Sequence, residues 1–321
     1  MSVMWQHPSS PALQCGLQAI LQPQPCHSVV ILDRHPNPWG GTFPAEIVTC
    51  RVDGEGELRF FCKYETGASA GSNGHRGGVE YERQVYRDLL EPRQLTVPRF
   101  YGSYQDESDG WLCLVLGHLD GSVRSSKAVE PHAIVRAAEW IGDFQAMMHD
   151  HVRQGPPPFL FGYDLNYYQG WSERALALSS SHDEQMTWLP AFCRRFNEAI
   201  GLLTREPLTV VHGEYYPPNV LWHLGTIRPV DWESAAVGAG EIDLASLTER
   251  WPQHITQKCE QAFVRHRWPS GEPPDFARRL DLARLYLQLR WLGTPRGWRV
   301  PAEPAWRFGQ IRHIAERQAL L

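Results

Sequence analysis

The stretch His212-Gly213-Glu214-Tyr215-Tyr216-Pro217-Pro218-Asn219 decides the fold, together with Asp231-Trp232-Glu233, which begins twelve positions after its last residue. Short apolar runs flank both segments, at 210–211 before the first and at 220–222 between the two. Apolar runs bounded by polar residues and prolines are typical of short buried strands. The sequence therefore predicts that the polar side chains of both segments lie on turns between strands, where the backbone holds them rigidly.

Three side chains of these segments have the chemistry that phosphoryl transfer requires. The reaction needs a carboxylate that orients the attacking hydroxyl and two oxygen ligands for Mg²⁺, because Mg²⁺ demands near-octahedral oxygen coordination. Glu214 is the candidate carboxylate, and Asn219 and Asp231 are the candidate metal ligands. We therefore expect a phosphoryl-transfer centre that uses ATP or GTP together with Mg²⁺.

These segments resemble motifs of the aminoglycoside phosphotransferase and choline kinase superfamily. The first resembles its HGDxxxxN loop, Asp231-Trp232-Glu233 resembles its second metal motif, and residues 240–245 are similar to its G-x-x-D-L-A continuation, in which the Asp, here Asp243, has a structural role. Protein kinases have a related loop. The resemblance covers roughly residues 30–250. It implies an α+β, two-lobed protein-kinase-like fold, with a small antiparallel-sheet N-lobe and a mainly helical C-lobe.

The chain departs from this pattern at Glu214, where the superfamily usually has Asp. A Glu carboxylate lies one methylene further from the backbone, and a general base must lie within roughly 2.6–3.2 Å of the proton that it accepts. The site is therefore either active with a shifted loop or inactive. We expect Glu214 to be a working base, because Pro217 and Pro218 would stiffen the loop. Glu233 is the next candidate if Glu214 only shapes the loop.

The N-terminal part of the chain has the pattern with which a kinase-like N-lobe begins. A short helix capped by Ser9 or Ser10 is followed by predicted strands over 29–32, 45–52 and 58–64, with a hairpin turn at 53–56. A further strand pair is predicted over 97–104 and 111–116. We expect an N-terminal extension over 1–27, the N-lobe over 28–119, and a helical C-lobe with the acceptor site over 120–321.

The resemblance assigns an ion pair to this N-lobe. Lys63, at the end of the third strand, resembles the strand Lys that pairs with nucleotide phosphates in kinase-like folds. Its expected partner is Glu82 on a helix predicted over 79–90, with Glu80 as the rival. Taken alone, these residues are better explained as solvated charges. We prefer the pair because the residues occur in the correct order ahead of the loop.

Two further segments are expected to contact the nucleotide. The loop at 39–44, which includes Thr42, could cover the phosphates, because glycines let backbone N–H groups approach anions. Leu116 and His118 mark the expected hinge, where main-chain groups hold the base. A Gly-Gly turn that joins two strands explains the first segment without a ligand, and an ordinary loop explains the second.

Composition excludes several other classes of protein. With 321 residues, 42% of them hydrophobic and 21% charged, the chain can form a two-lobed globular protein with a sizeable core. The net charge of −5 gives no argument for a nucleic acid or membrane partner. No apolar run approaches about 18 residues, and the first 24 residues lack a signal-peptide pattern. Seven scattered cysteines indicate reduced thiols and a cytoplasmic location.

The acceptor is indicated only by the charge of residues 252–321, which have twelve Lys or Arg and six Asp or Glu. A polycationic aminoglycoside prefers an acidic cleft. We therefore expect transfer to a hydroxyl of a small molecule, either a sugar, a nucleoside or a biosynthetic intermediate, and not to an aminoglycoside. A basic solvated helical face explains the same charges.

Two alternatives remain open. One is a kinase that acts on Ser or Thr of a peptide or protein. The short interval between Asp231 and Asp243 leaves no room for the long activation loop of a conventional protein kinase, but a compact peptide kinase survives that objection. The other is a catalytically silent scaffold that binds nucleotide.

Overall fold

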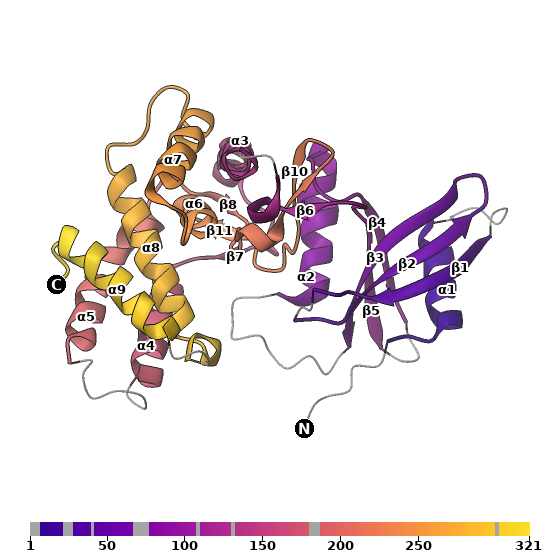
Figure 1. Ribbon diagram of the computed structural model, residues 1–321, viewed down its shortest axis with the longest axis horizontal. Helices are drawn as coiled ribbons and strands as arrows, with labels where there is room; N and C mark the ends of the chain where they lie inside the picture. Colours follow the sequence, from indigo (N-terminus) through magenta and orange to yellow (C-terminus); the bar gives the residue numbers. More distant parts are fainter. Residues whose placement is uncertain are drawn as a thin grey trace. The chain divides into compact units, whose positions relative to one another are not determined.

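The computed structural model describes residues 7–21, 28–39, 42–66, 77–106, 110–129, 132–179, 187–298 and 302–321. The chain groups into two compact units (Figure 1). The first consists of residues 1–123 and 221–234, and the second consists of residues 124–220 and 235–321. None of the helices in the described ranges is both long enough and apolar enough to cross a lipid bilayer.

The first unit is built on a five-stranded antiparallel sheet with the order β1-β2-β3-β5-β4. Its strands are β1 (Val29–Pro36), β2 (Ala45–Val52), β3 (Gly56–Thr66), β4 (Phe100–Gln105) and β5 (Trp111–Gly117). Gly54 and Gly56 close the β2–β3 hairpin with φ values of 86° and 85°, a region that favours glycine. The predicted strands are present, and β1 extends four residues beyond its predicted end.

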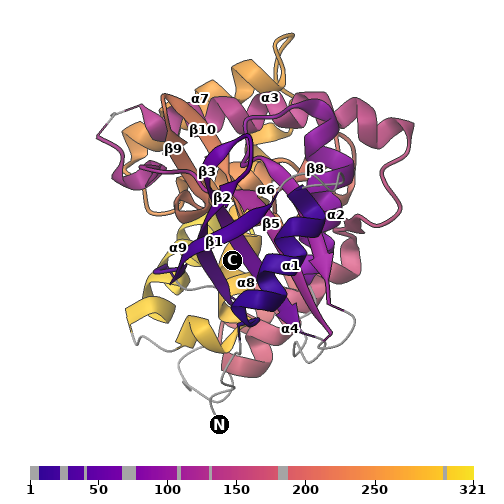
Figure 2. The same ribbon diagram turned by 90° about the vertical axis from the view of Figure 1, so that its right-hand side faces the viewer.

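Helix α1 (Ser10–Leu21) packs on one face of this sheet (Figure 2). Ser9 caps the helix, because its hydroxyl oxygen accepts the backbone N–H of Ala12 at 3.3 Å. Leu13 and Leu17, one turn apart, are buried in the core that the sheet forms. The structure thus groups α1 with the sheet and not as an extension of its own.

The helix expected over 79–90 changes its hydrogen-bond pattern midway. Helix α2 (Gly78–Gln84) continues into a π-helical turn, η1 (Val85–Leu90), and a 3-10 turn, η2 (Glu91–Arg93). Far along the chain, the hairpin β9 (Val220–His223) and β10 (Thr226–Pro229) leads to residues 231–234. The segment 221–234, expected with the helical C-lobe, belongs to the first unit.

The second unit is mainly helical. Its helices are α3 (Ala133–Gln154), α4 (Leu165–Ser179), α5 (Leu189–Ala199), α6 (Glu241–Thr248), α7 (Gln253–Arg267), α8 (Phe276–Leu292) and α9 (Ala302–Arg317). Helix α3 packs along α7, and α8 contacts α4, α6 and α9 (Figure 1). Most residues of α8 are buried, so this helix forms the core of the unit.

A small sheet with the order β7-β11-β8 completes the second unit. Its strands are β7 (Phe161–Gly162), β8 (Thr209–Val211) and β11 (Ala236–Gly238). Strand β8 leads directly into the loop 212–219. The remaining short elements are β6 (Val123–Arg124), η3 (Ser125–Lys127), η4 (Ile200–Thr204), η5 (Pro217–Asn219) and η6 (Pro295–Trp298).

The cysteines that the structure describes are free thiols, as the sequence predicts: Cys15, Cys50, Cys62, Cys113, Cys193 and Cys259. Cys26 lies outside the described residues.

Candidate active site

Lys63 of β3 lies among three carboxylates of the first unit. Its Nζ atom is 2.7 Å from Glu82 Oε2, 2.7 Å from Asp231 Oδ1 and 2.9 Å from Glu233 Oε2. Strand β3 supplies the ammonium group, α2 supplies Glu82, and the segment after β10 supplies the other two carboxylates. Residues that are far apart in the sequence therefore form one cluster, which we call the Lys63 cluster.

Glu82, and not Glu80, forms the expected ion pair. The carboxylate of Glu80 instead accepts hydrogen bonds from Arg83 and Gln84 on the same helix. Glu82 also uses its second oxygen, Oε1, to accept the backbone N–H of Trp232 at 3.1 Å. One carboxylate thus fixes both the ammonium group of Lys63 and the turn that carries Asp231.

Burial sets the charge balance of the Lys63 cluster. Burial alone lowers the pKa of Lys63, but the attraction of Asp231, Glu82 and Glu233 outweighs it and raises that pKa well above its ordinary value. Burial raises the pKa of Glu82, and Lys63 opposes this effect. The side chain of Glu233 is only 1% exposed, whereas that of Asp231 is 36% exposed. One ammonium group faces three carboxylates, so a further cation would neutralise the excess of negative charge.

The donor atoms of this cluster fit a Mg²⁺ ion. Carboxylate oxygens of Glu82, Asp231 and Glu233 all lie within 4.8 Å of one another, and oxygen ligands of this kind are those that Mg²⁺ takes. Asp231 is the most accessible of the three. Its φ of 69° lies in the left-handed region, which non-glycine residues adopt rarely and often at functional sites.

The loop 212–219 in the second unit is held by Asp243 in the first turn of α6. The two oxygens of this carboxylate accept the backbone N–H groups of His212 at 2.8 Å and Gly213 at 2.9 Å. Gln145 of α3 donates to it at 3.0 Å. Burial raises the pKa of Asp243 to about 7, and these donors oppose the effect. Asp243 therefore fixes the backbone of the loop, in the structural role that the resemblance implies.

Glu214 is buried and pairs with Arg290 of α8. The Nη2 atom of Arg290 donates to Glu214 Oε1, and its Nη1 atom donates to the carbonyl oxygen of Gly213 at 2.7 Å. Burial alone would lower the pKa of Arg290, but Tyr286 and Glu214 raise it well above its ordinary value. Arg290 is not among the predicted site residues, because no motif marks it and it lies 76 positions along the chain from Glu214.

Asn219 closes the loop at η5. Its Nδ2 atom donates to the carbonyl oxygen of Glu214 at 3.1 Å, so the amide oxygen of the side chain is available to a metal ion. Asn219 belongs to the second unit and Asp231 to the first. Their joint role as Mg²⁺ ligands stays a prediction.

The segment expected to cover the phosphates is only partly described. Thr42 lies exposed in a bend before β2, while Gly40 and Gly41 lie outside the described residues. Phe43 is buried, and Lys63 Nζ lies 5.5 Å from the centroid of its ring. The residue after Thr42 therefore covers the ammonium group of Lys63.

The two hinge residues lie at the end of β5. Leu116 pairs with Phe61 of β3 on one side and with Phe100 of β4 on the other. The backbone N–H of His118 donates to the carbonyl oxygen of Arg59 at 3.0 Å. The sheet therefore engages the His118 N–H, and the assignment of Leu116 and His118 to base binding stays a prediction.

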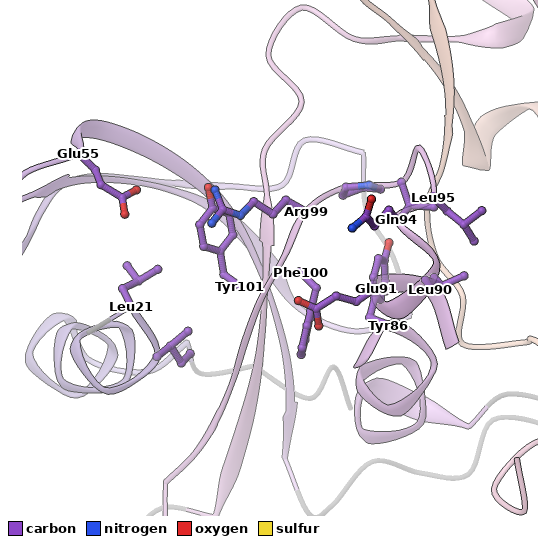
Figure 3. Close-up of a pocket in the computed structure, with 13 residues that line it drawn as sticks. Leu21, Glu55, Tyr86, Leu90, Glu91, Gln94, Leu95, Arg99, Phe100 and Tyr101 are labelled. Atoms are coloured by element: carbon purple, nitrogen blue, oxygen red, sulfur yellow. The ribbon is translucent and has the colours of Figure 1, made fainter. Parts of the chain in front are cut away.

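A pocket of about 470 Å³ lies elsewhere in the first unit (Figure 3). It is lined by the end of α1, by η1 and η2 and by the start of β4, with Leu21, Glu91, Arg99 and Tyr101 around it. Its lining contains none of the predicted nucleotide-binding residues of the described ranges. This pocket is therefore distinct from the candidate site.

Many basic residues of the segment 252–321 form ion pairs within the second unit. The pairs are Arg279 with Glu241, Arg284 with Glu260, Arg290 with Glu214, Arg307 with Glu249, and Arg317 with Asp281. Three of these carboxylates, those of Glu214, Glu241 and Glu249, lie outside the segment, so they offset part of its positive surplus.

No curated protein matches the sequence. Many solved structures are similar to the chain, among them the following three. A mutant aminoglycoside 2′-phosphotransferase-IIIa in complex with GDP has a TM-score of 0.63 and 15% identity, over 96% of this chain and 98% of that chain. An aminoglycoside phosphotransferase from Alicyclobacillus acidocaldarius has a TM-score of 0.60 and 15% identity, over 99% of this chain and 96% of that chain. An amicoumacin kinase in complex with AMP-PNP, Ca²⁺ and Ami has a TM-score of 0.57 and 16% identity, over 97% of this chain and 94% of that chain.

These likenesses confirm the predicted α+β, two-lobed protein-kinase-like fold. The family model described as the phosphotransferase enzyme family matches residues 73–280. This range is more than half of the chain, and it includes both the loop 212–219 and Asp231. The chain belongs to the phosphotransferase enzyme family.

Proposed function

We propose that the protein transfers the γ-phosphoryl group of ATP or GTP, with Mg²⁺, to a hydroxyl group of a small molecule. The Lys63 cluster carries this proposal. A buried ammonium group beside an accessible carboxylate suits the binding of nucleotide phosphates and a hard cation. One of the similar structures contains GDP, and another contains AMP-PNP with Ca²⁺. These complexes support a nucleotide and a divalent cation as ligands.

Each residue has a defined role in the proposed reaction. Lys63 binds the nucleotide phosphates, and Glu82 orients Lys63. Asn219 and Asp231 would hold Mg²⁺, which when bound offsets the negative charge of the phosphates. Glu214 orients the acceptor hydroxyl and takes its proton while the new O–P bond forms and the bond from the γ-phosphorus to the leaving diphosphate breaks. Because such a transition state is loose, orientation of the hydroxyl is the larger contribution.

The acceptor that we propose is a sugar, a nucleoside or a biosynthetic intermediate, and not an aminoglycoside. The positive surplus of residues 252–321 supports this choice, because a polycationic acceptor prefers an acidic cleft. Tyr216 and Trp291, with ring centroids 6.0 Å apart, lie beside Glu214 and Arg290 in the sequence and offer faces on which a ring can stack. A conventional protein kinase is less well supported, because the chain between Glu233 and α6 contains only β11 and turns, whereas a compact peptide kinase stays an alternative.

A catalytically silent nucleotide-binding scaffold is the second candidate. The buried pair of Glu214 and Arg290 favours it, since a carboxylate that is bound to a guanidinium group is less available to an acceptor hydroxyl. Turnover by the unmodified protein decides between the two candidates.

The metal assignment can be tested with Asp231→Asn and with the matched control Asp88→Asn, whose carboxylate pairs with Arg87 on the surface of the same unit. Calorimetry would measure ATP binding with and without Mg²⁺, and thermal melting would show that each variant is folded. We expect Mg²⁺ to strengthen ATP binding in the wild type and the control. In Asp231→Asn this gain should fall by at least about tenfold, or roughly 1.4 kcal/mol. An unchanged gain would show that Asp231 is not a metal ligand.

A further inference from the structure

Arg290 contacts two neighbouring groups of the loop 212–219, a backbone carbonyl oxygen and the side-chain carboxylate of the next residue. One guanidinium nitrogen binds the carbonyl oxygen of Gly213 at 2.7 Å, and another binds the carboxylate of the next residue, Glu214. The two side chains of this pair are 6% and 7% exposed. A planar guanidinium group has a fixed fork of donors, so this contact fixes the Glu214 side chain relative to its own backbone.

The backbone of the loop is fixed from a different element. Asp243 of α6 accepts the N–H groups of His212 and Gly213, and α6 itself packs on α8. The N–H groups are thus held by a carboxylate, and the carbonyl oxygen of Gly213 is held by a guanidinium group. The carboxylate of Glu214, at the end of a flexible side chain, is bound by the same guanidinium group.

From this geometry, and on the basis of the proposed function, we infer that Arg290 is the positioning residue that makes a Glu workable at position 214. A Glu side chain has one more rotatable bond than Asp, so its carboxylate samples more positions, and a displacement of about 1 Å at a reacting group can cost roughly 10²-fold in rate. The Arg290 contact removes that freedom. The two prolines of the loop, which the sequence suggested for this purpose, act on the backbone and not on the carboxylate.

The inference predicts a specific coupling between positions 214 and 290. Without Arg290, the long side chain of Glu214 loses the two-point guanidinium contact that fixes its carboxylate relative to the loop, and turnover falls. An Asp at position 214 has no need of this support, because its shorter side chain keeps the carboxylate near the backbone. With Arg290 present, an Asp side chain at position 214 is too short to keep the contact with the guanidinium group. The effect of Glu214→Asp should therefore change sign when Arg290 is removed.

The experiment compares the wild type with Glu214→Asp, Arg290→Gln and the double variant. The readout is single-turnover hydrolysis of ATP with Mg²⁺, with water as acceptor and the protein in excess, together with ATP affinity by calorimetry. The control is Arg284→Gln on the same helix, which removes an Arg that pairs with Glu260. We expect Arg290→Gln to lower the rate constant by about 10²-fold with little change in ATP affinity. The double variant should be at least about tenfold faster than Arg290→Gln.

A double variant that is no faster than Arg290→Gln would overturn the inference. If Arg290→Gln does not fold, Arg290→Lys takes its place in both variants, since Lys keeps the charge but lacks the fork of donors, and the same reversal is required. The outcome for the proposed function is separate. If the wild type binds ATP with Mg²⁺ but transfers its γ-phosphoryl group neither to water nor to any acceptor in a screen of sugars, nucleosides, peptides and aminoglycosides, the proposed function fails, whatever the variants do.

Discussion

Asp243, which holds the loop 212–219, makes a pH-dependent contribution to the stability of the protein. Its carboxylate is buried and accepts the N–H groups of His212 and Gly213. Its pKa in the folded protein is raised to about 7, whereas an unperturbed Asp has a pKa of about 3.9. The folded state therefore binds a proton more tightly than the unfolded state. The resulting contribution to stability is fully present below about pH 4 and is lost as the pH rises through 7.

We expect Asp243→Asn to flatten this part of the stability profile. The wild type should lose unfolding free energy between pH 4 and pH 7, by an amount on the order of 4 kcal/mol at most from this group. Urea denaturation at several pH values would measure the slope in both proteins. The exposed Asp150, changed to Asn, is the control and should keep the wild-type slope. An Asp243→Asn profile parallel to that of the wild type would contradict the assignment.

Some of these residue contacts were predictable from the sequence and others were not. The Lys63–Glu82 pair was predictable, because each residue sits in a recognisable element and the elements occur in a known order. The additional contact of Lys63 with Glu233 and the contact of Glu214 with Arg290 were not, because local patterns do not encode contacts between distant segments. A buried polar side chain requires a partner, but the sequence does not say which one.

At the scale of elements, α1 is part of the core of the first unit. Leu13 and Leu17 are 1% and 0% exposed against the sheet. Short apolar runs bounded by turn residues predicted the strands of that sheet. The π-helical turn after α2 was not predictable, since the apolar spacing of residues 79–90 is also satisfied by an ordinary helix. The grouping of residues 221–234 with the first unit depends on long-range contacts, which the spacing of motifs does not show.

Leu17→Ala should therefore destabilise the protein strongly. Removing a fully buried Leu side chain costs about 2–5 kcal/mol, since the cavity does not collapse completely. Cys15→Ala, at an exposed position of the same helix, is the control and should cost less than about 1 kcal/mol. Denaturant titration monitored by fluorescence would compare them. Equal stabilities would mean that α1 is dispensable, as an extension outside the N-lobe would be.

At the scale of the whole molecule, the positive surplus of residues 252–321 gives an expectation about the acceptor. We expect aminoglycosides such as kanamycin to be poor acceptors, with kcat/KM below roughly 10⁴ M⁻¹s⁻¹, the lower end of the usual enzyme range. A screen of sugars, nucleosides and aminoglycosides by ADP or GDP release would test this. Efficient turnover of an aminoglycoside would refute the argument from the charge of residues 252–321.

The position of α8 has a practical consequence for anyone who trims or recombines this chain. The segment that matches the family ends at residue 280, within the second turn of a helix that continues to Leu292. It also begins at residue 73, after Lys63. An expression boundary drawn at those limits would keep the signature loop but discard both Lys63 and Arg290. Gene libraries and chimaeras should therefore preserve the chain from α1 through the end of α8.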